Sequence, residues 1–208
     1  MIRYILFIKG LQNVLVGSSV LYLMAAPVVL ALFPALVPAS YINTAFAVSL
    51  STATFVMAIR PLADMFPKAR WLRSLVILRK GFGVVSASVI VGFILTRIMQ
   101  NGLGVYLLSW LEPSYWSLEG FALFAHLGDV TAIVLLVTSN NFSKRKLGKS
   151  WKRVQKLAYV YFYAAALYKV LAFDSVFAGV ALVSVTVLVL MAFVRNKITR
   201  LTPVSTLA

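Results

Sequence analysis

The sequence contains no cysteine and only one histidine, His126. Disulfide frameworks, thiolate metal centres, iron–sulfur clusters and multi-histidine metal cages all need these residues, so the composition excludes them. Acidic residues are also scarce: the sequence has five Asp and Glu, compared with twenty Lys and Arg. We therefore expect no metal site, and few ordinary active sites remain possible.

Apolar residues dominate what is present. Of the 208 residues, 62% are hydrophobic and only 12% are charged, and the mean hydropathy is +0.94. Soluble domains do not have this composition, so we predict an integral membrane protein. At roughly 20 residues for each crossing of the bilayer, a chain of this length accommodates about six spans.

Six hydrophobic stretches are long enough to cross the hydrocarbon core. They cover residues 11–33, 41–59, 81–100, 120–138, 157–173 and 176–194. The first stretch is too long and too uniformly apolar for a signal peptide, so we expect it to be a span. No internal repeat or linker divides the chain. The prediction is an all-α integral membrane protein, with a single transmembrane domain over residues 1–208 that forms a six-transmembrane-helix bundle.

The basic residues predict the orientation of this bundle. Eighteen of the twenty fall on one face of the predicted bundle. They lie in the N-terminal segment, in segments 60–80 and 144–156, and after residue 194. Because basic residues accumulate in cytoplasmic loops, we expect both termini to be cytoplasmic. Contact with anionic lipid headgroups then accounts for the net charge of +15, and no nucleic-acid partner is expected.

Two local patterns refine this prediction. Residues 70–80 have a partly apolar and a basic face, which predicts a segment along the cytoplasmic interface. Small residues recur at four-residue spacings in the third span, at Gly83, Ala87, Ser88 and Gly92. They predict close approach between helices.

Polar side chains inside the spans are the candidate functional residues, because charges in the bilayer are unfavourable. His126 and Asp129 share one face of the fourth span, within reach of Arg97 near the outer end of the third. This cluster is either a proton-handling or quinone-contacting site, or an ion-paired group that fixes helix packing. Lys169 of the fifth span either extends its ammonium group to the interface or contacts a substrate.

Catalytic motifs are missing. The sequence has no GxGxxG, Walker A, HExxH or GxSxG pattern, and no soluble portion is large enough for a nucleotide-binding domain. We therefore do not expect this chain to be an enzyme on its own.

Two stretches carry a resemblance to a known family. Arg60-Pro61-Leu62, followed by a basic loop and Leu78-Arg79-Lys80-Gly81-Phe82-Gly83, resembles the ferric-reductase-like transmembrane domain. Thr138-Ser139-Asn140 and the later run Leu147-Gly148-Lys149-Ser150-Trp151-Lys152-Arg153-Val154-Gln155-Lys156-Leu157-Ala158-Tyr159 are similar to its bacterial MsrQ (YedZ) branch. The resemblance covers about residues 41–194.

The resemblance implies b-type haem between helices, electron transfer across the bacterial inner membrane and, in this branch, a periplasmic methionine sulfoxide reductase as partner. Family histidines on spans three and five hold the haem. At those positions this sequence has Phe93, Gln155 and Tyr168. A phenyl ring and a primary amide are not normal haem ligands, and tyrosinate is a rare one. His126 lies on span four, where the family has no ligand.

Two function hypotheses follow from these missing ligands. The leading one is a haem-free, non-catalytic membrane subunit or assembly partner, because Phe93 and Tyr168 fill space that a porphyrin needs. It has no cofactor, and it contacts membrane lipid and another membrane or periplasmic protein. The alternative is a transmembrane electron-transfer protein that holds haem b, a flavin or a quinone by other contacts and serves a partner oxidoreductase. A transporter or channel lacks its expected repeat.

Overall fold

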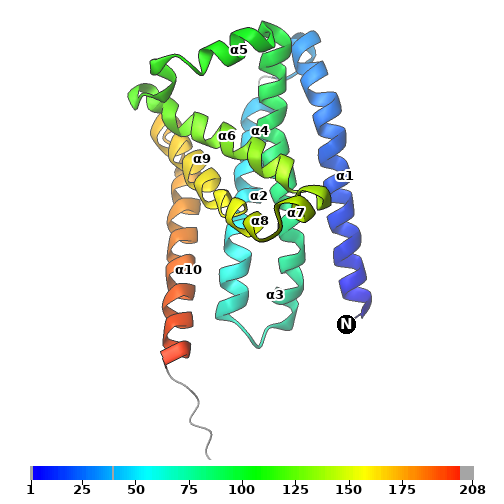
Figure 1. Ribbon diagram of the computed structural model, residues 1–208, viewed down its shortest axis with the longest axis vertical. Coiled ribbons are helices and arrows are strands. Elements are labelled where there is room, and N and C mark those ends of the chain that lie inside the picture. Colours follow the sequence, from blue (N-terminus) through cyan, green and yellow to red (C-terminus); the bar gives the residue numbers. More distant parts are fainter. Residues whose placement is uncertain (1, 39, 202–208) are drawn as a thin grey trace, which may run out of the picture.

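The computed structural model describes residues 2–38 and 40–201, and within these residues it contains helices and short connections but no strand. Four long helices run along the long axis of the molecule (Figure 1). These are α1 (Ile2–Leu32), α2 (Ser40–Met65), α4 (Arg79–Asn101) and α10 (Val176–Leu201). Two shorter helices, α6 (Ala122–Thr138) and α9 (Leu157–Phe173), run obliquely across them. The predicted all-α class is confirmed.

Four described helical segments are long and apolar enough to cross a membrane: Arg3–Leu32, Ser40–Met65, Trp71–Asn101 and Val176–Ile198. A fifth is reached only if α6 and the helices after it count as one span, and that pair is bent by 93°. The chain is therefore an all-α membrane protein with four or five such segments. Stretches 120–138 and 157–173 form α6 and α9, of 17 residues each. At about 1.5 Å per residue each is about 25 Å long, shorter than the roughly 30 Å core.

The long helices extend past the apolar stretches that predict them. The first begins at Ile2 instead of residue 11, and α2 continues to Met65 with Pro61 inside it. Basic residues are good helix formers, so the helical hydrogen bonds continue where the hydropathy falls. The prediction of an interfacial segment at 70–80 is wrong, because α3 (Arg70–Leu75) and a short 3₁₀ turn lead directly into α4 as one helical run, Trp71–Asn101.

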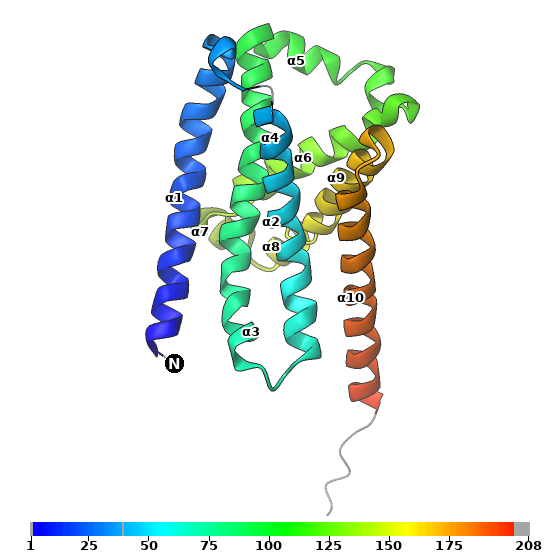
Figure 2. The ribbon, with the colours of Figure 1, turned by 180° about the vertical axis from the view of Figure 1, so that it is seen from behind.

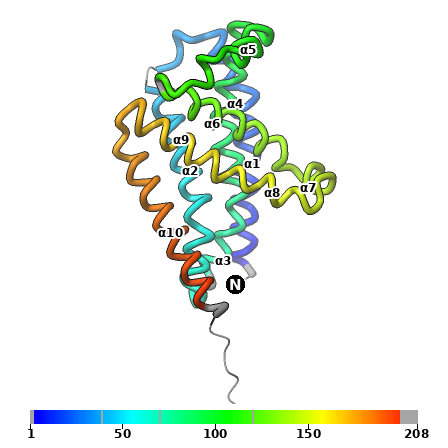
Figure 3. The backbone as a smooth tube through the Cα atoms, turned by 60° about the vertical axis from the view of Figure 1, so that its left-hand side comes forward, coloured from blue at the N-terminus to red at the C-terminus, as the bar shows by residue number. Residues whose placement is uncertain are grey.

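The basic segments do not all lie at one level. The start of α1, the connection around α3 and the end of α10 lie at one end of the molecule, and α5 (Leu103–Ser109) lies at the other (Figures 1 and 2). The basic cluster of α7 (Asn141–Leu147) and α8 (Trp151–Val154) projects sideways at an intermediate height (Figure 3). It forms the tip of the oblique α6–α9 hairpin.

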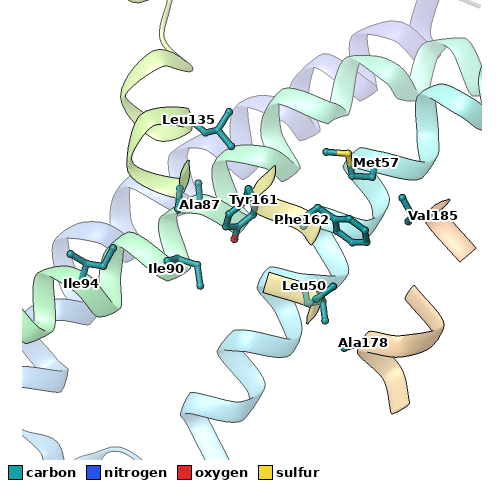
Figure 4. Packing of buried hydrophobic residues seen from close by; sticks show 13 residues of the cluster. Leu50, Met57, Ala87, Ile90, Ile94, Leu135, Tyr161, Phe162, Ala178 and Val185 are labelled. Atoms are coloured by element: carbon teal, nitrogen blue, oxygen red, sulfur yellow. The ribbon is translucent and has the colours of Figure 1, made fainter. Parts of the chain in front are cut away.

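The core lies where α2, α4, α6, α9 and α10 meet. Phe162 of α9 is fully buried and lies toward Met57 of α2 and Val185 of α10 (Figure 4). A buried side chain of this size makes many van der Waals contacts in a densely packed interior, and together these contacts stabilise the bundle. This packing fixes α9, which carries part of the site described below.

Glycine allows α1 to approach α4 closely. A Cβ atom on Gly92 would lie 2.8 Å from Cε1 of Tyr22, and one on Gly81 would lie 3.0 Å from Cδ1 of Leu15. The Tyr22 ring is also held from α2, because the Tyr41 hydroxyl donates a hydrogen bond to its hydroxyl at 3.3 Å. The predicted close approach at Gly92 is therefore present.

Candidate functional site

A cavity of about 260 Å³ lies between α2, α4, α6 and α9. Aromatic side chains form much of its wall, namely Phe46, Phe93, Phe124 and Phe173. Its polar lining groups are the side chains of Ser49, Arg97, His126, Asp129, Tyr161, Tyr168 and Lys169. An apolar hollow with a few converging polar groups is the usual form of a small-molecule site.

The structure brings together all four polar candidates of the sequence. Arg97 comes from α4, His126 and Asp129 from α6, and Lys169 from α9. Among the described residues, no hydrogen bond or ion pair joins the side chains of these four to one another or to other residues. They share a cavity without forming a closed ion-pair network.

The ring of His126 is held by aromatic stacking. Tyr115, from the connection between α5 and α6, stacks on it with ring centroids 4.3 Å apart and planes 27° from parallel. Trp116 lies next to the same ring, at a centroid distance of 6.0 Å. The connection therefore covers the α5 end of the cavity, and the imidazole is buried beneath it.

Lys169 lies against aromatic faces. Its Nζ atom is 4.7 Å from the ring centroid of Phe46 and 4.3 Å from that of Phe173. Cation–π contacts of this length stabilise an ammonium group away from water. The half-buried side chain thus holds a positive charge at the wall of the cavity.

Two of the three positions that the family resemblance assigns to haem ligands face this cavity. Phe93 stacks on Phe46, with centroids 4.9 Å apart and planes 8° from parallel. Tyr168 meets Phe173 edge to face, at 5.6 Å. Gln155 lies elsewhere, at the junction of α8 and α9, where its Nε2 donates to Thr138 Oγ1 at 3.4 Å.

The residues that line the cavity do not supply the pair of histidines that holds a haem in the family that the sequence resembles. Neither a phenyl ring nor the distant amide of Gln155 supplies a nitrogen ligand, and the one imidazole is stacked against Tyr115. No group of three His, Cys, Asp or Glu that could hold a metal ion occurs in the part of the chain that the structure describes.

Sequence reasoning misses the hydroxyl network at the inner side of the cavity. The Tyr161 hydroxyl lies 2.9 Å from Ser49 Oγ and 2.9 Å from Ser86 Oγ, and these two serine oxygens are 3.1 Å apart. Ser86 Oγ also donates to the Ser49 carbonyl at 2.8 Å. All three side chains are buried. The network joins α2, α4 and α9, and serines are too frequent in these spans for sequence to single out this pair.

A second pocket, of about 400 Å³, lies at the α5 end. Gln100, Tyr106, Ser109 and Tyr115 are among its lining residues, and Arg97 borders both this pocket and the inner cavity. The Tyr106 hydroxyl is buried without a hydrogen-bond partner in the described residues. The guanidinium of Arg97 therefore marks the boundary between an outer polar pocket and an inner aromatic cavity.

The comparisons with known proteins add no family. No family model, curated protein or solved structure matches the chain. Fold and site together define the class, an all-α membrane protein with a ligand-sized aromatic cavity between its helices. The ferric-reductase-like resemblance stays a prediction.

Proposed function

We propose that the chain is a haem-free, non-catalytic membrane subunit or assembly partner built on a ferric-reductase-like bundle. The observation that carries the proposal is the position of Phe93, which the resemblance equates with a haem-ligand histidine. Its ring is stacked on Phe46 inside the cavity. An aromatic pair there occupies space that a porphyrin needs and supplies no ligand to iron.

The proposal includes six spans with both termini on the cytoplasmic side. Lys9 lies 23 residues before the end of α1, Arg60 lies 20 residues after the start of α2, and Arg195 lies 19 residues after the start of α10. At about 1.5 Å per residue these separations are about 28–35 Å, close to the thickness of the hydrocarbon core. Basic residues at this depth favour a cytoplasmic boundary there, in a bacterial inner membrane. The basic cluster of α7 and α8 lies at an intermediate height and does not contribute to this argument.

The exposed face of α1 is the surface that we assign to the partner protein, although membrane lipid covers such a face equally well. This helix packs mainly on α4, and Leu21 and Met24 are each 71% exposed. Extraction of the tagged chain from its native membrane in a gentle detergent tests the role. We expect a complex larger than the monomer that contains a second membrane or periplasmic protein. Recovery of the isolated monomer alone contradicts the subunit role.

One observation favours the redox alternative. Tyr168 lines the cavity, and tyrosinate is a known, though rare, ligand of haem iron. In this alternative the chain transfers electrons through haem b, a flavin or a quinone to a partner oxidoreductase. A cofactor that copurifies in stoichiometric amount and changes its absorbance on reduction distinguishes this function from the haem-free one.

A further inference from the structure

Five polar side chains converge on the inner cavity without a partner in the protein. They are Arg97, His126, Asp129, Tyr168 and Lys169. In the described chain none of these side chains makes a hydrogen bond or an ion pair with another residue. Arg97 interacts with Asp129 and His126 only through its charge at longer range, and Lys169 Nζ lies over the rings of Phe46 and Phe173. His126 is buried, Asp129, Tyr168 and Lys169 are partly buried, and Arg97 is exposed. Polar groups at the wall of an apolar cavity favour a ligand that supplies partners for them.

The charges of the cavity restrict what this molecule is. Arg97 and Lys169 are cations, Asp129 is a carboxylate, and all three face the same space. A purely anionic ligand competes with the carboxylate of Asp129 for the positive charge of Arg97. A purely cationic ligand meets two like charges, and Lys169 already occupies the faces of the Phe46 and Phe173 rings. The complement is a group that carries an anion and a protonated amine.

The size of the cavity fits a small zwitterion. Its volume of about 260 Å³ holds roughly nine molecules of water at about 30 Å³ each. A phosphoethanolamine group has a similar number of non-hydrogen atoms. Its tetrahedral phosphate accepts several hydrogen bonds, which suits the fork of donors on an arginine.

The depth of the charges matches that of lipid headgroups. Arg97 lies four residues before Asn101, the last residue of α4, and Lys169 lies four residues before Phe173, the last of α9. At about 1.5 Å per residue both are about 6 Å inside the helix ends. Asp129 lies seven residues after the start of α6, or about 10 Å. Because α6 and α9 run obliquely (Figure 1), these distances along the helices are upper limits on the distance from the α5 end. In the proposed topology the charges therefore lie near the boundary between headgroups and acyl chains at that end.

We infer that the inner cavity binds a zwitterionic phosphoethanolamine group, with its phosphate at Arg97 and Lys169 and its protonated amine at Asp129. The aromatic wall at Phe93 and Phe124 contacts the methylene groups next to the phosphate. The inference rests on the proposed haem-free function, because a porphyrin and this group cannot share the cavity. Phosphatidylethanolamine of the leaflet and a free phosphoethanolamine present the same chemistry.

Calorimetric titration of the purified, detergent-solubilised chain tests the inference. The probes are short-chain phosphatidylethanolamine, free O-phosphoethanolamine and short-chain phosphatidylglycerol, which has the phosphate but no amine. We expect the zwitterionic lipid to bind more tightly than phosphatidylglycerol by about tenfold or more. Binding of the lipid alone identifies a membrane source, whereas similar affinity for free phosphoethanolamine identifies a soluble one. Both results support the inference.

A pair of matched variants tests the role of the carboxylate. Asp129→Asn should bind phosphatidylethanolamine and phosphatidylglycerol with similar Kd, because the amine loses its counter-charge. The control is Asp174→Asn, at the exposed end of α9 and outside the cavity, which should keep the wild-type preference. If Asp129→Asn does not fold, the preference of the wild-type chain still decides.

Equal affinity of the wild-type chain for the two lipids, or no binding of any probe, overturns the inference. These outcomes are separate from failure of the haem-free function. A preparation that contains stoichiometric haem contradicts that function, whereas a haem-free preparation that binds none of the probes contradicts only the choice of ligand.

Discussion

The rings of Phe46 and Phe93 lie face to face, 4.9 Å apart between centroids and 8° from parallel. One comes from α2 and the other from α4, and both line the inner cavity. The pair therefore joins α2 to α4, which α3 and a short 3₁₀ turn separate in the sequence. Stacked aromatic pairs contribute about 0.5–1.5 kcal/mol beyond their buried area.

The contact of α1 with α4 predicts a specific sensitivity at Gly92. Gly92→Ala places a methyl group 2.8 Å from the Tyr22 ring, which Tyr41 restrains by a hydrogen bond. We expect a loss of about 1–3 kcal/mol in the free energy of unfolding. The measurement is thermal unfolding in detergent.

Gly83→Ala on the same helix is the control for this substitution. The nearest atom to its new methyl group is 4.0 Å away, on Val56. Alanine is the better helix former, so the control should be neutral or stabilising by up to about 1 kcal/mol. Equal unfolding midpoints for the two variants would contradict the close packing of Tyr22.

The buried hydroxyl network predicts the effect of Tyr161→Phe. The variant removes the two 2.9 Å hydrogen bonds with the Ser49 and Ser86 hydroxyls and the 3.2 Å hydrogen bond that the Tyr161 hydroxyl donates to the Ser86 carbonyl. The serines stay bonded to each other and to backbone carbonyls. We expect a loss of about 0.6–1.5 kcal/mol in unfolding free energy. Tyr159→Phe, at an exposed position of the same helix, should change it by less than about 0.5 kcal/mol. If the two variants have the same free energy of unfolding, the network does not contribute to stability and the prediction is contradicted.

The absence of cysteine makes the orientation directly measurable. Ser114→Cys in the connection after α5 and Ser150→Cys at the tip of the α6–α9 hairpin introduce single exposed thiols. With a membrane-impermeant maleimide, we expect Ser114→Cys to react in intact cells and Ser150→Cys only after permeabilisation. Labelling of both from the same side contradicts the proposed topology.

The long helices follow from the sequence because each depends on a continuous local property. Apolar runs predict α1, α2, α4 and α10, and the helix ends differ where basic residues such as Lys9 continue the helix beyond the hydrocarbon core. The tilt of α6 and α9 has no such local cause. The tilt is set by packing against α2, α4 and α10, through side chains such as Phe162. The hydrophobic periodicity of a single segment therefore does not predict it.

The sequence predicts individual residues of the site, but it does not predict the contacts between them. Charges inside spans single out Arg97, Asp129 and Lys169, because each is unfavourable in lipid. That Lys169 lies between two aromatic rings depends on helices distant in sequence. The hydroxyl network around Ser86 was not predicted for the same reason, since small polar residues in spans are common and only the packed bundle brings three of them together.

The absorbance spectrum of the wild-type chain, measured beside that of Phe93→His/Tyr168→His, tests the central claim most directly. Both substitutions place imidazoles in one cavity, and two histidine ligands are the usual haem b arrangement of the family that the sequence resembles. We expect no haem absorbance from the wild-type chain, and in the variant a haem band that shifts with dithionite. Gln155→His alone, away from the cavity, should bind none. About one equivalent of haem in the wild-type chain, with a dithionite-induced shift, would contradict the account.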